Sequence, residues 1–200
     1  MQIMNWTEIE PAGSGAEKLD AGAYVLRIKE VSERTSRNGD PYLTFLYDIA
    51  EGEHANHYAG ETRDYVHSFN RSYTGNAAPF FSSFLHALED SNPGRFNLKE
   101  WSERNVRDQV YHWEAFAKLI IGALFRDRMY TSSKTGKDVT ALDFVRAMPA
   151  DDVRKGNWTV PPAKDDRDKP ETGSDGYFAA PTAKAVPAQD STPYDADIPF

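Results

Sequence analysis

The chain has 200 residues, of which 27% are charged and 40% hydrophobic, and its mean hydropathy is −0.66. This length suits one domain, or one domain with an appendage, and excludes a large multidomain enzyme. The absence of cysteine excludes disulfides, thiol catalysis and thiolate metal sites. The formal charge of −8 argues against a nucleic-acid partner if it is spread evenly along the chain.

Targeting signals are not evident in the sequence. No run approaches the ~18–20 consecutive apolar residues of a membrane span. Residues 1–6 lack the basic-then-apolar order of a signal peptide. We therefore expect a cytoplasmic protein.

The charge and the prolines divide the chain into two parts. Residues 1–160 hold 19 Lys and Arg against 23 Asp and Glu, whereas residues 161–200 hold 4 against 8. Seven of the twelve prolines also lie in that last stretch, which has almost no Leu, Ile or Val. Such a segment cannot bury enough apolar surface to offset the entropy lost on ordering. We expect a folded domain over 1–160 and a disordered, Pro-rich acidic tail over 161–200.

The first half of the expected domain has the alternation typical of strands. Residues 22–31 place Tyr24, Leu26 and Ile28 on one face and Arg27 and Lys29 on the other. An Asn-Gly turn over 36–40 leads into a returning strand over 41–49. In that strand Tyr47 falls on the core side and Tyr42 on the outer side. A third strand over 62–69 completes a meander.

Helical periodicity then replaces alternation. Residues 77–90 place Phe80, Phe81, Phe84, Leu85 and Leu88 on one helical stripe. A second helix is expected after Asn97, a good N-cap, with Leu98, Trp101 and Val106 on its apolar side. Strands over 115–130 and 139–147 form a second hairpin. Three strands, a helix and a hairpin is the element order of an OB-fold, so we predict a mainly β, five-stranded OB-fold-like barrel with one or two helices.

No enzyme signature is present in the sequence. Phosphate loops, nucleophile elbows and zinc-protease motifs are all missing, and no compact carboxylate cluster lies outside the tail. His54 and His57 lie three residues apart in a Gly-flanked loop without a third ligand, which favours a solvated loop over a metal site. We predict a protein without catalysis, metal or cofactor.

Basic residues are interleaved with aromatic ones along the expected strands. Single-stranded nucleic acid requires this mixture, because cations follow the phosphates and aromatic faces stack on bases. Aromatic strand residues belong more often to a core, and a basic strand face is often only solvated, so composition leaves both interpretations open. The candidate strand-binding residues are Arg27, Lys29, Arg34, Arg37, Tyr42, Arg63, Tyr65, Arg71, Tyr73, Arg126, Arg128, Tyr130, Lys134 and Lys137.

The last six residues are Asp195-Ala196-Asp197-Ile198-Pro199-Phe200. They resemble the acidic tip of bacterial single-stranded DNA-binding proteins, which typically end Asp-Asp-Asp-Ile-Pro-Phe, and depart from it only at Ala196. A terminal ring and α-carboxylate suit a small apolar pocket edged by Arg or Lys, and the aspartates add steering. The resemblance implies a protein-binding tip formed by Asp195, Asp197, Ile198, Pro199 and Phe200.

Four motifs within residues 5–163 carry a second resemblance. They are Gly22-Ala23-Tyr24, Asn38-Gly39-Asp40-Pro41-Tyr42-Leu43, Phe125-Arg126-Asp127-Arg128-Met129-Tyr130 and Lys155-Gly156-Asn157-Trp158-Thr159-Val160-Pro161. The set resembles a phage family long described as a domain of unknown function, whose members sit among replication and recombination genes. They are considered OB-fold single-stranded DNA-binding proteins. The resemblance implies the fold and the ligand and assigns no contact residues.

Together these features predict a phage or prophage protein that coats single-stranded DNA in the bacterial host cytoplasm. Its tip would recruit replication, recombination and repair proteins, and homo-oligomerisation stays open. The alternative is an adaptor or decoy that occupies host tail-binding proteins through residues 198–200 without binding DNA. A strand-annealing recombinase is disfavoured, because those chains need a larger oligomerising body.

Overall fold

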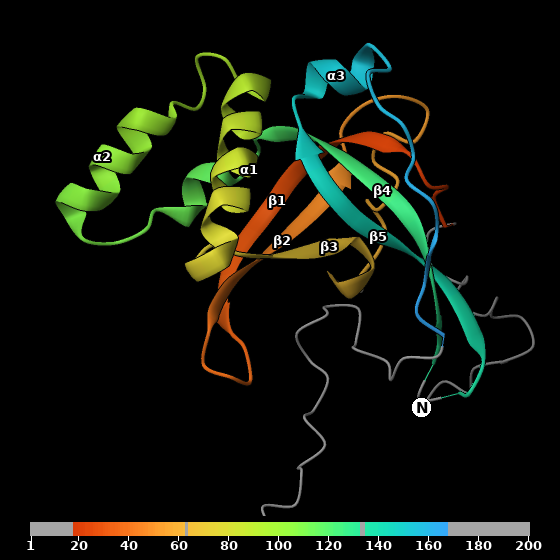
Figure 1. Ribbon diagram of the computed structural model, residues 1–200. Helices are drawn as coiled ribbons and strands as arrows, with labels where there is room; N and C mark the ends of the chain where they lie inside the picture. The colour runs from red at the N-terminus through yellow and green to blue at the C-terminus, as the bar shows by residue number, and fades with distance from the viewer. Residues whose placement is uncertain (1–17, 63, 133–134, 168–200) are drawn as a thin grey trace, which may run out of the picture.

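The fold is built around one six-stranded sheet, seen in a computed structural model that describes residues 18–62, 64–132 and 135–167 (Figure 1). The strand order is β3-β2-β1-β4-β5, every pair on this path is antiparallel, and β6 pairs parallel to β4. The strands are β1 (Ala23–Thr35), β2 (Pro41–Ile49), β3 (Ser68–Ser72), β4 (Ile120–Thr131), β5 (Asp138–Met148) and β6 (Lys164–Asp165). The helices are α1 (Ala78–Ser91), α2 (Leu98–Asp108) and α3 (Ala150–Arg154), with short 3-10 turns η1 (Asp64–His67), η2 (Gly75–Ala77) and η3 (Trp113–Phe116).

The predicted meander is confirmed, with two changes in its strands. β2 has the predicted bounds, whereas β1 continues to Thr35. The third strand was predicted over 62–69 and lies instead over 68–72, because residues 64–67 form the 3-10 turn η1.

A β-bulge at Lys29 lets β1 remain paired with β2 from Leu26 to Thr35. Ile28 lies opposite Tyr47 and Glu30 opposite Leu46, so Lys29 is an extra residue between two paired positions. The register then continues with Ser32 opposite Thr44. A bulge of this kind bends its strand and increases the local twist.

Helix α1 confirms the predicted stripe except at one position. Phe81, Phe84, Leu85 and Leu88 are buried, whereas Phe80 is 76% exposed. Phe80 therefore lies outside the buried arc, which is narrower than the stripe that the sequence predicted.

Helix α2 begins as the sequence predicts. The Asn97 side chain accepts a hydrogen bond from the Glu100 backbone N–H at 2.9 Å, as an N-cap should. Trp101 is buried, but the expected apolar contact of Val106 is wrong, since that side chain is 79% exposed. The helix ends at Asp108, and Gln109 turns the chain away in a left-handed conformation with φ 53°.

The second hairpin begins later in the chain than predicted. Residues 113–116 are the 3-10 turn η3, and Lys118 adopts a φ of 68°, which interrupts an extended strand. β4 therefore begins at residue 120. Neither α3 nor β6 was predicted.

The core lies between the curved sheet and α1, with α2 on the outer side of α1 (Figure 1). Phe45 of β2 lies 4.9 Å from Phe84 and 5.1 Å from Phe69, measured between ring centroids. Phe69 in turn stacks on Phe144 of β5 at 4.4 Å. The two edge strands of the described sheet thus meet through side chains, although no backbone ladder joins them.

Asn92 connects the end of α1 to the start of β4. Its amide donates to the carbonyls of Leu88 and Ile120, each at 2.7 Å, and its side-chain oxygen accepts from the Ile120 N–H at 3.0 Å. Because Asn92 is 2% exposed, these bonds satisfy a polar side chain that burial would otherwise penalise.

In the described part of the chain, no helix has the length and apolar character needed to cross a bilayer.

Candidate functional site

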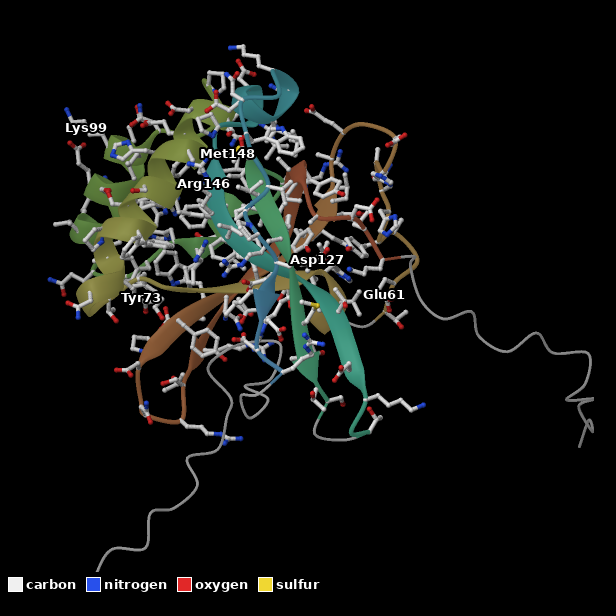
Figure 2. The ribbon with its side chains drawn as sticks, turned by 45° about the vertical axis from the view of Figure 1, so that its right-hand side comes forward. Glu61, Tyr73, Lys99, Asp127, Arg146 and Met148 are labelled. Carbon is white, nitrogen blue, oxygen red and sulfur yellow. The ribbon has the colours of Figure 1, made fainter. Side chains whose placement is uncertain are left out.

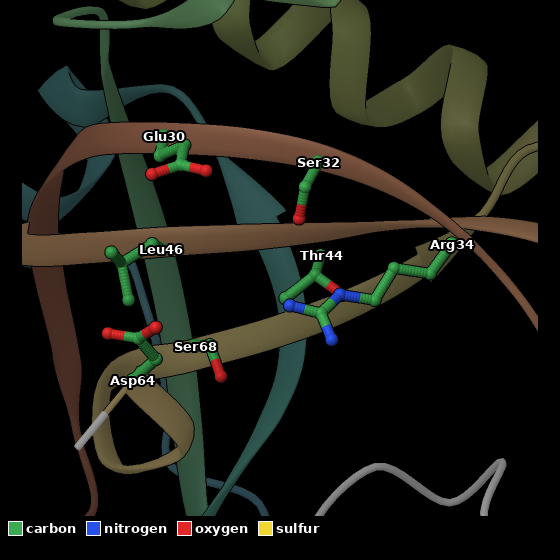
Figure 3. Close-up of a pocket in the computed structure, with 7 residues that line it drawn as sticks. All are labelled: Glu30, Ser32, Arg34, Thr44, Leu46, Asp64 and Ser68. Carbon is green, nitrogen blue, oxygen red and sulfur yellow. The ribbon is translucent and has the colours of Figure 1, made fainter.

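A polar hollow lies on the face of β1, β2 and β3 that is turned away from the core (Figure 3). Strands β1 and β2 provide most of its lining, and η1 and the start of β3 close one side. The lining residues are Glu30, Ser32, Arg34, Thr44, Leu46, Asp64 and Ser68. We call this surface the outer hollow.

Strand pairing brings these side chains together. In an antiparallel pair, residues directly opposite each other project from the same face of the sheet. Thr44 lies opposite both Ser32 of β1 and Asn70 of β3, and its hydroxyl donates to the Asn70 side-chain oxygen at 2.8 Å. The bulge at Lys29 keeps Glu30 and Arg34 on this same face.

The charged groups of the outer hollow are uncommitted within the described chain. The side chains of Glu30, Arg34 and Asp64 make no hydrogen bond or ion pair with any described residue, and all three residues are exposed. Two carboxylates and one guanidinium therefore face solvent in one depression.

Three further predicted cations lie on β1 and in the turn that follows it. Arg27, Lys29 and Arg37 are exposed, and Lys29 and Arg37 have no ion-pair partner among the described residues. Arg27 donates to the neutral side-chain oxygen of Asn56 at 3.5 Å. The structure thus groups four of the predicted cations, Arg34 included, along one strand and its turn.

The second hairpin differs from what the sequence predicts. Arg126 forms an ion pair with Asp143 at 2.9 Å. Arg128 forms one with Asp166 at 2.9 Å, and in this second pair the Arg128 side chain is only 11% exposed and that of Asp166 only 4%. Lys164 also contacts Asp166 at 2.9 Å. Both guanidinium groups therefore already have a carboxylate partner, although Asp166 is shared with Lys164, and a role of Arg126 and Arg128 in strand binding stays a prediction.

The predicted stacking residues are mostly not open platforms. Tyr42 was expected on an exposed face but is 1% exposed. Tyr73 is half-buried against Phe81 and Trp113, and burial together with nearby Glu33 raises the pKa of its hydroxyl to about 12.

The remaining candidates are scattered. The Arg71 guanidinium lies 4.1 Å over the Phe144 ring, at the junction of β3 and β5. Tyr130 is half-buried, with the Arg128 guanidinium 5.5 Å from its ring centroid, and Lys137 is exposed in the β4–β5 turn. Outside the described residues or side chains lie Arg63, Tyr65, Lys134, Asp195, Asp197, Ile198, Pro199 and Phe200.

Sequence reasoning missed several residues of the candidate site. Glu30, Asp64 and the hydroxyl residues of the outer hollow were not predicted, because strand binding favours cations and aromatics as candidates. Tyr111 was also missed, although it is 52% exposed and stacks on Trp113 at 4.5 Å. Its position just after α2 was the only sequence signal of that exposure.

A buried histidine lies in η1 close to the outer hollow. His67 is 1% exposed, and its ring stacks on Tyr58 with centroids 5.2 Å apart. Burial lowers the pKa of His67, and the positive charge of Lys29 lowers it further. We therefore expect a neutral imidazole at pH 7.

Metal binding has no support in the described residues. They contain no group of three or more His, Cys, Asp or Glu side chains placed to hold an ion. The rings of His54 and His57 are 5.9 Å apart, edge to face.

The geometry thus defines a small, mainly β protein with an open polar hollow on one sheet face. Residues 9–111, just over half of the chain, match the family described as protein of unknown function (DUF669), and the chain belongs to this family. The match includes every residue that lines the outer hollow. No curated protein matches the chain.

Proposed function

We propose that this protein binds single-stranded DNA along the outer face of β1, β2 and β3. The observation that carries the proposal is the row of accessible cations on β1 and its turn. Lys29 and Arg37 are exposed without an ion-pair partner among the described residues. Such cations are available to phosphates, whereas Arg126 and Arg128 already form ion pairs with carboxylates.

The chain topology supports an OB-fold-like barrel as the scaffold. Helix α1 lies between β3 and β4 in the chain, as the helix of an OB-fold does. Phe69 and Phe144 stack across the gap between β3 and β5, the two edges that are joined when an OB-fold barrel is closed, and this contact supports the proposal. OB-folds bind oligonucleotides on the face formed around strands 2 and 3, and the outer hollow adjoins this face, with a lining that comes mostly from β1 and β2.

The biological role in the proposal is that of a phage or prophage protein that coats exposed strands during replication, recombination and repair. A surface that follows phosphates without a catalytic group suits such coating. The tail tip, residues 195–200, would recruit partner proteins; its support is the resemblance of its sequence, because it lies outside the described residues.

Fluorescence anisotropy with a labelled oligomer of thymidine tests the proposal. The full chain should bind the single strand more tightly than a duplex of the same length, and binding should weaken as salt rises. Equal binding to both forms would point to a general attraction for polyanions. A protein that ignores the oligomer yet captures host tail-binding proteins through its tip would instead be the adaptor.

A further inference from the structure

We infer that the outer hollow is a subsite that prefers guanine over the other bases of a bound strand. This inference rests on the proposed function, since it assumes that a single strand crosses the outer face. It adds a preference among bases to a surface that cations alone would make indifferent to sequence.

The arrangement of charge in the outer hollow carries the argument. Figure 3 shows the carboxylates of Glu30 and Asp64 on either side of Leu46, with the guanidinium of Arg34 beside Thr44, further along the sheet. Opposite charges thus share one depression, yet they make no ion pair with each other. The acceptors and the donors all remain available to a ligand.

A phosphate does not suit this hollow. Two carboxylates outnumber one guanidinium, so a phosphate placed beside Arg34 would also face the charges of Glu30 and Asp64. Lys29 and Arg37 lie outside the lining set, and we assign the backbone phosphates to them. A base edge, which is neutral and carries both donors and acceptors, fits the mixed lining better.

Guanine offers hydrogen-bonding groups for both kinds of charge in the outer hollow. Its Watson–Crick edge presents two adjacent donors, N1–H and the N2 amino group, and a carboxylate can accept both. Its O6 and N7 are adjacent acceptors, which an arginine can bind in bidentate fashion. We therefore assign the N1 and N2 edge to Glu30 or Asp64, and O6 and N7 to Arg34.

The other bases match less well. Thymine offers a single N–H between two carbonyl groups, and these repel a carboxylate. Cytosine and adenine each place a ring acceptor beside the amino group, so the second carboxylate oxygen meets a lone pair. Leu46 adds an apolar contact to any base, and the hydroxyls of Ser32 and Ser68 can donate or accept, so neither sets the preference.

The test compares thymidine oligomers that carry one central guanine, inosine, 7-deazaguanine, adenine or cytosine with the unmodified oligomer. Single insertions avoid guanine quadruplexes. The full-length protein should bind the guanine oligomer about fivefold or more tightly than the thymidine oligomer, in the range of one bidentate base contact. Inosine lacks the N2 amino group and 7-deazaguanine lacks N7, so each should lose part of that gain.

Variants separate the two ends of the outer hollow. Glu30→Gln and Asp64→Asn should reduce the guanine preference while affinity for the thymidine oligomer holds or rises, because negative charge is removed. Arg34→Gln should erase the difference between guanine and 7-deazaguanine. Glu103→Gln, on α2 and 66% exposed, is the matched control and should change nothing.

The outcomes distinguish failure of this inference from failure of the proposed function. Equal affinity for all the oligomers overturns the guanine preference and leaves strand binding intact. Failure to bind any oligomer overturns both. Free dGMP should compete only weakly, because a single nucleotide lacks the backbone contacts; if dGMP binds while the oligomers do not, the outer hollow is a nucleotide site and strand binding is wrong.

Discussion

Phe69 on β3 and Phe144 on β5 stack with ring centroids 4.4 Å apart and planes inclined by 18°. Phe69 is 7% exposed, and the Arg71 guanidinium covers the Phe144 ring at 4.1 Å. No backbone ladder joins these two strands in the described sheet, so the contact between its edges depends on these side chains.

Truncation of Phe144 should therefore weaken the fold measurably. Phe144→Ala should lower the free energy of unfolding by about 1–3 kcal/mol, less than for a fully buried Phe, because the ring is half-buried. Urea denaturation provides the measurement. Phe80→Ala is the control: at 76% exposure it should change the free energy by no more than about 0.5 kcal/mol. Equal effects of both variants would mean that the ring stack does not join the strands.

Removal of cations from β1 and its turn should alter the salt dependence of DNA binding. Lys29→Gln with Arg37→Gln leaves up to two phosphates without a cation, so the log–log salt slope should become shallower by about 0.7 for each of these phosphates. The control is Lys99→Gln on α2, whose 83% exposed side chain Figure 2 shows far from the sheet. Anisotropy titrations at several salt concentrations measure both. An unchanged slope would place the phosphates elsewhere on the molecule.

Two truncations should behave differently, because the described body extends beyond residue 160. Deletion of residues 161–200 removes Asp166 and so breaks its 2.9 Å ion pair with Arg128, whose side chain is 11% exposed. Loss of one member of such a pair should cost about 2 kcal/mol or more. Deletion of residues 168–200 keeps the pair and should leave the melting temperature unchanged.

The shorter deletion also tests the effect of the tail on binding. Residues 168–200 contain two Lys against six Asp or Glu, which predicts that they compete with phosphates for basic surface. Their removal should preserve or improve affinity for single strands, most clearly at low salt, where screening is weakest. Markedly weaker binding by this variant would contradict the competition.

Deletion of Phe200 tests the tip. This residue carries both the largest apolar side chain of the tip and the α-carboxylate, and removal of such an anchor commonly costs ~2 kcal/mol or more. Calorimetry against a host replication-restart helicase or recombination mediator should show that binding is abolished, with melting temperature and DNA affinity unchanged. If the partner still binds, the resemblance of the tip is accidental.

Mild acid should destabilise the fold through His67. Because the folded state holds the pKa of His67 below 6.5, the unfolded chain binds the proton more readily. Titration of His67 therefore leaves the free energy of unfolding at its full value above pH 6.5. This free energy declines as the pH falls from 6.5 through the folded pKa, by at most about 1.4 kcal/mol per pH unit. Lys29 adds to this shift, whereas Asp48, Glu61 and Asp64 oppose it.

Urea denaturation at pH 7.5 and 5.5 measures this effect. His67→Phe keeps an aromatic ring against Tyr58 and should reduce the loss of stability between the two values. His86→Phe, whose wild-type side chain is 65% exposed, should retain the wild-type loss. If His67→Phe behaves like the wild type, the titrating group lies elsewhere.

Short-range patterns account for much of the fold. Alternation over 41–49 predicts β2, the stripe over 77–90 predicts α1 to within a residue, and Asn97 predicts the start of α2. The predictions that were wrong concern segments whose structure depends on tertiary contacts. The segment 64–67 is short and partly apolar, which suggests a strand. It forms instead a 3-10 turn that buries His67.

The candidate site was harder to predict, because its members come from three segments. The exposed faces of Arg27 and Lys29 follow from alternation, and both were predicted. The charge state of the second hairpin does not follow from it, since Asp166, the partner of Arg128, lies 38 residues further along the chain. Glu30 and Asp64 meet only after η1 folds back beside β2, and no local pattern in the sequence encodes that proximity.

Lys29 is the one residue between Leu26 and Thr35 that lacks a partner on β2. Its deletion would leave Ile28 opposite Tyr47 and Glu30 opposite Leu46, so every side chain would keep its face of the sheet. The strand would lose its bend, however, and a straighter β1 would carry β2 and β3 away from β5. Lys29 is therefore one of two extra residues that shape this sheet, the other being Val145 of β5, between Phe144 and Arg146. Deletion of this exposed lysine would change the curvature of the sheet without removing a core side chain.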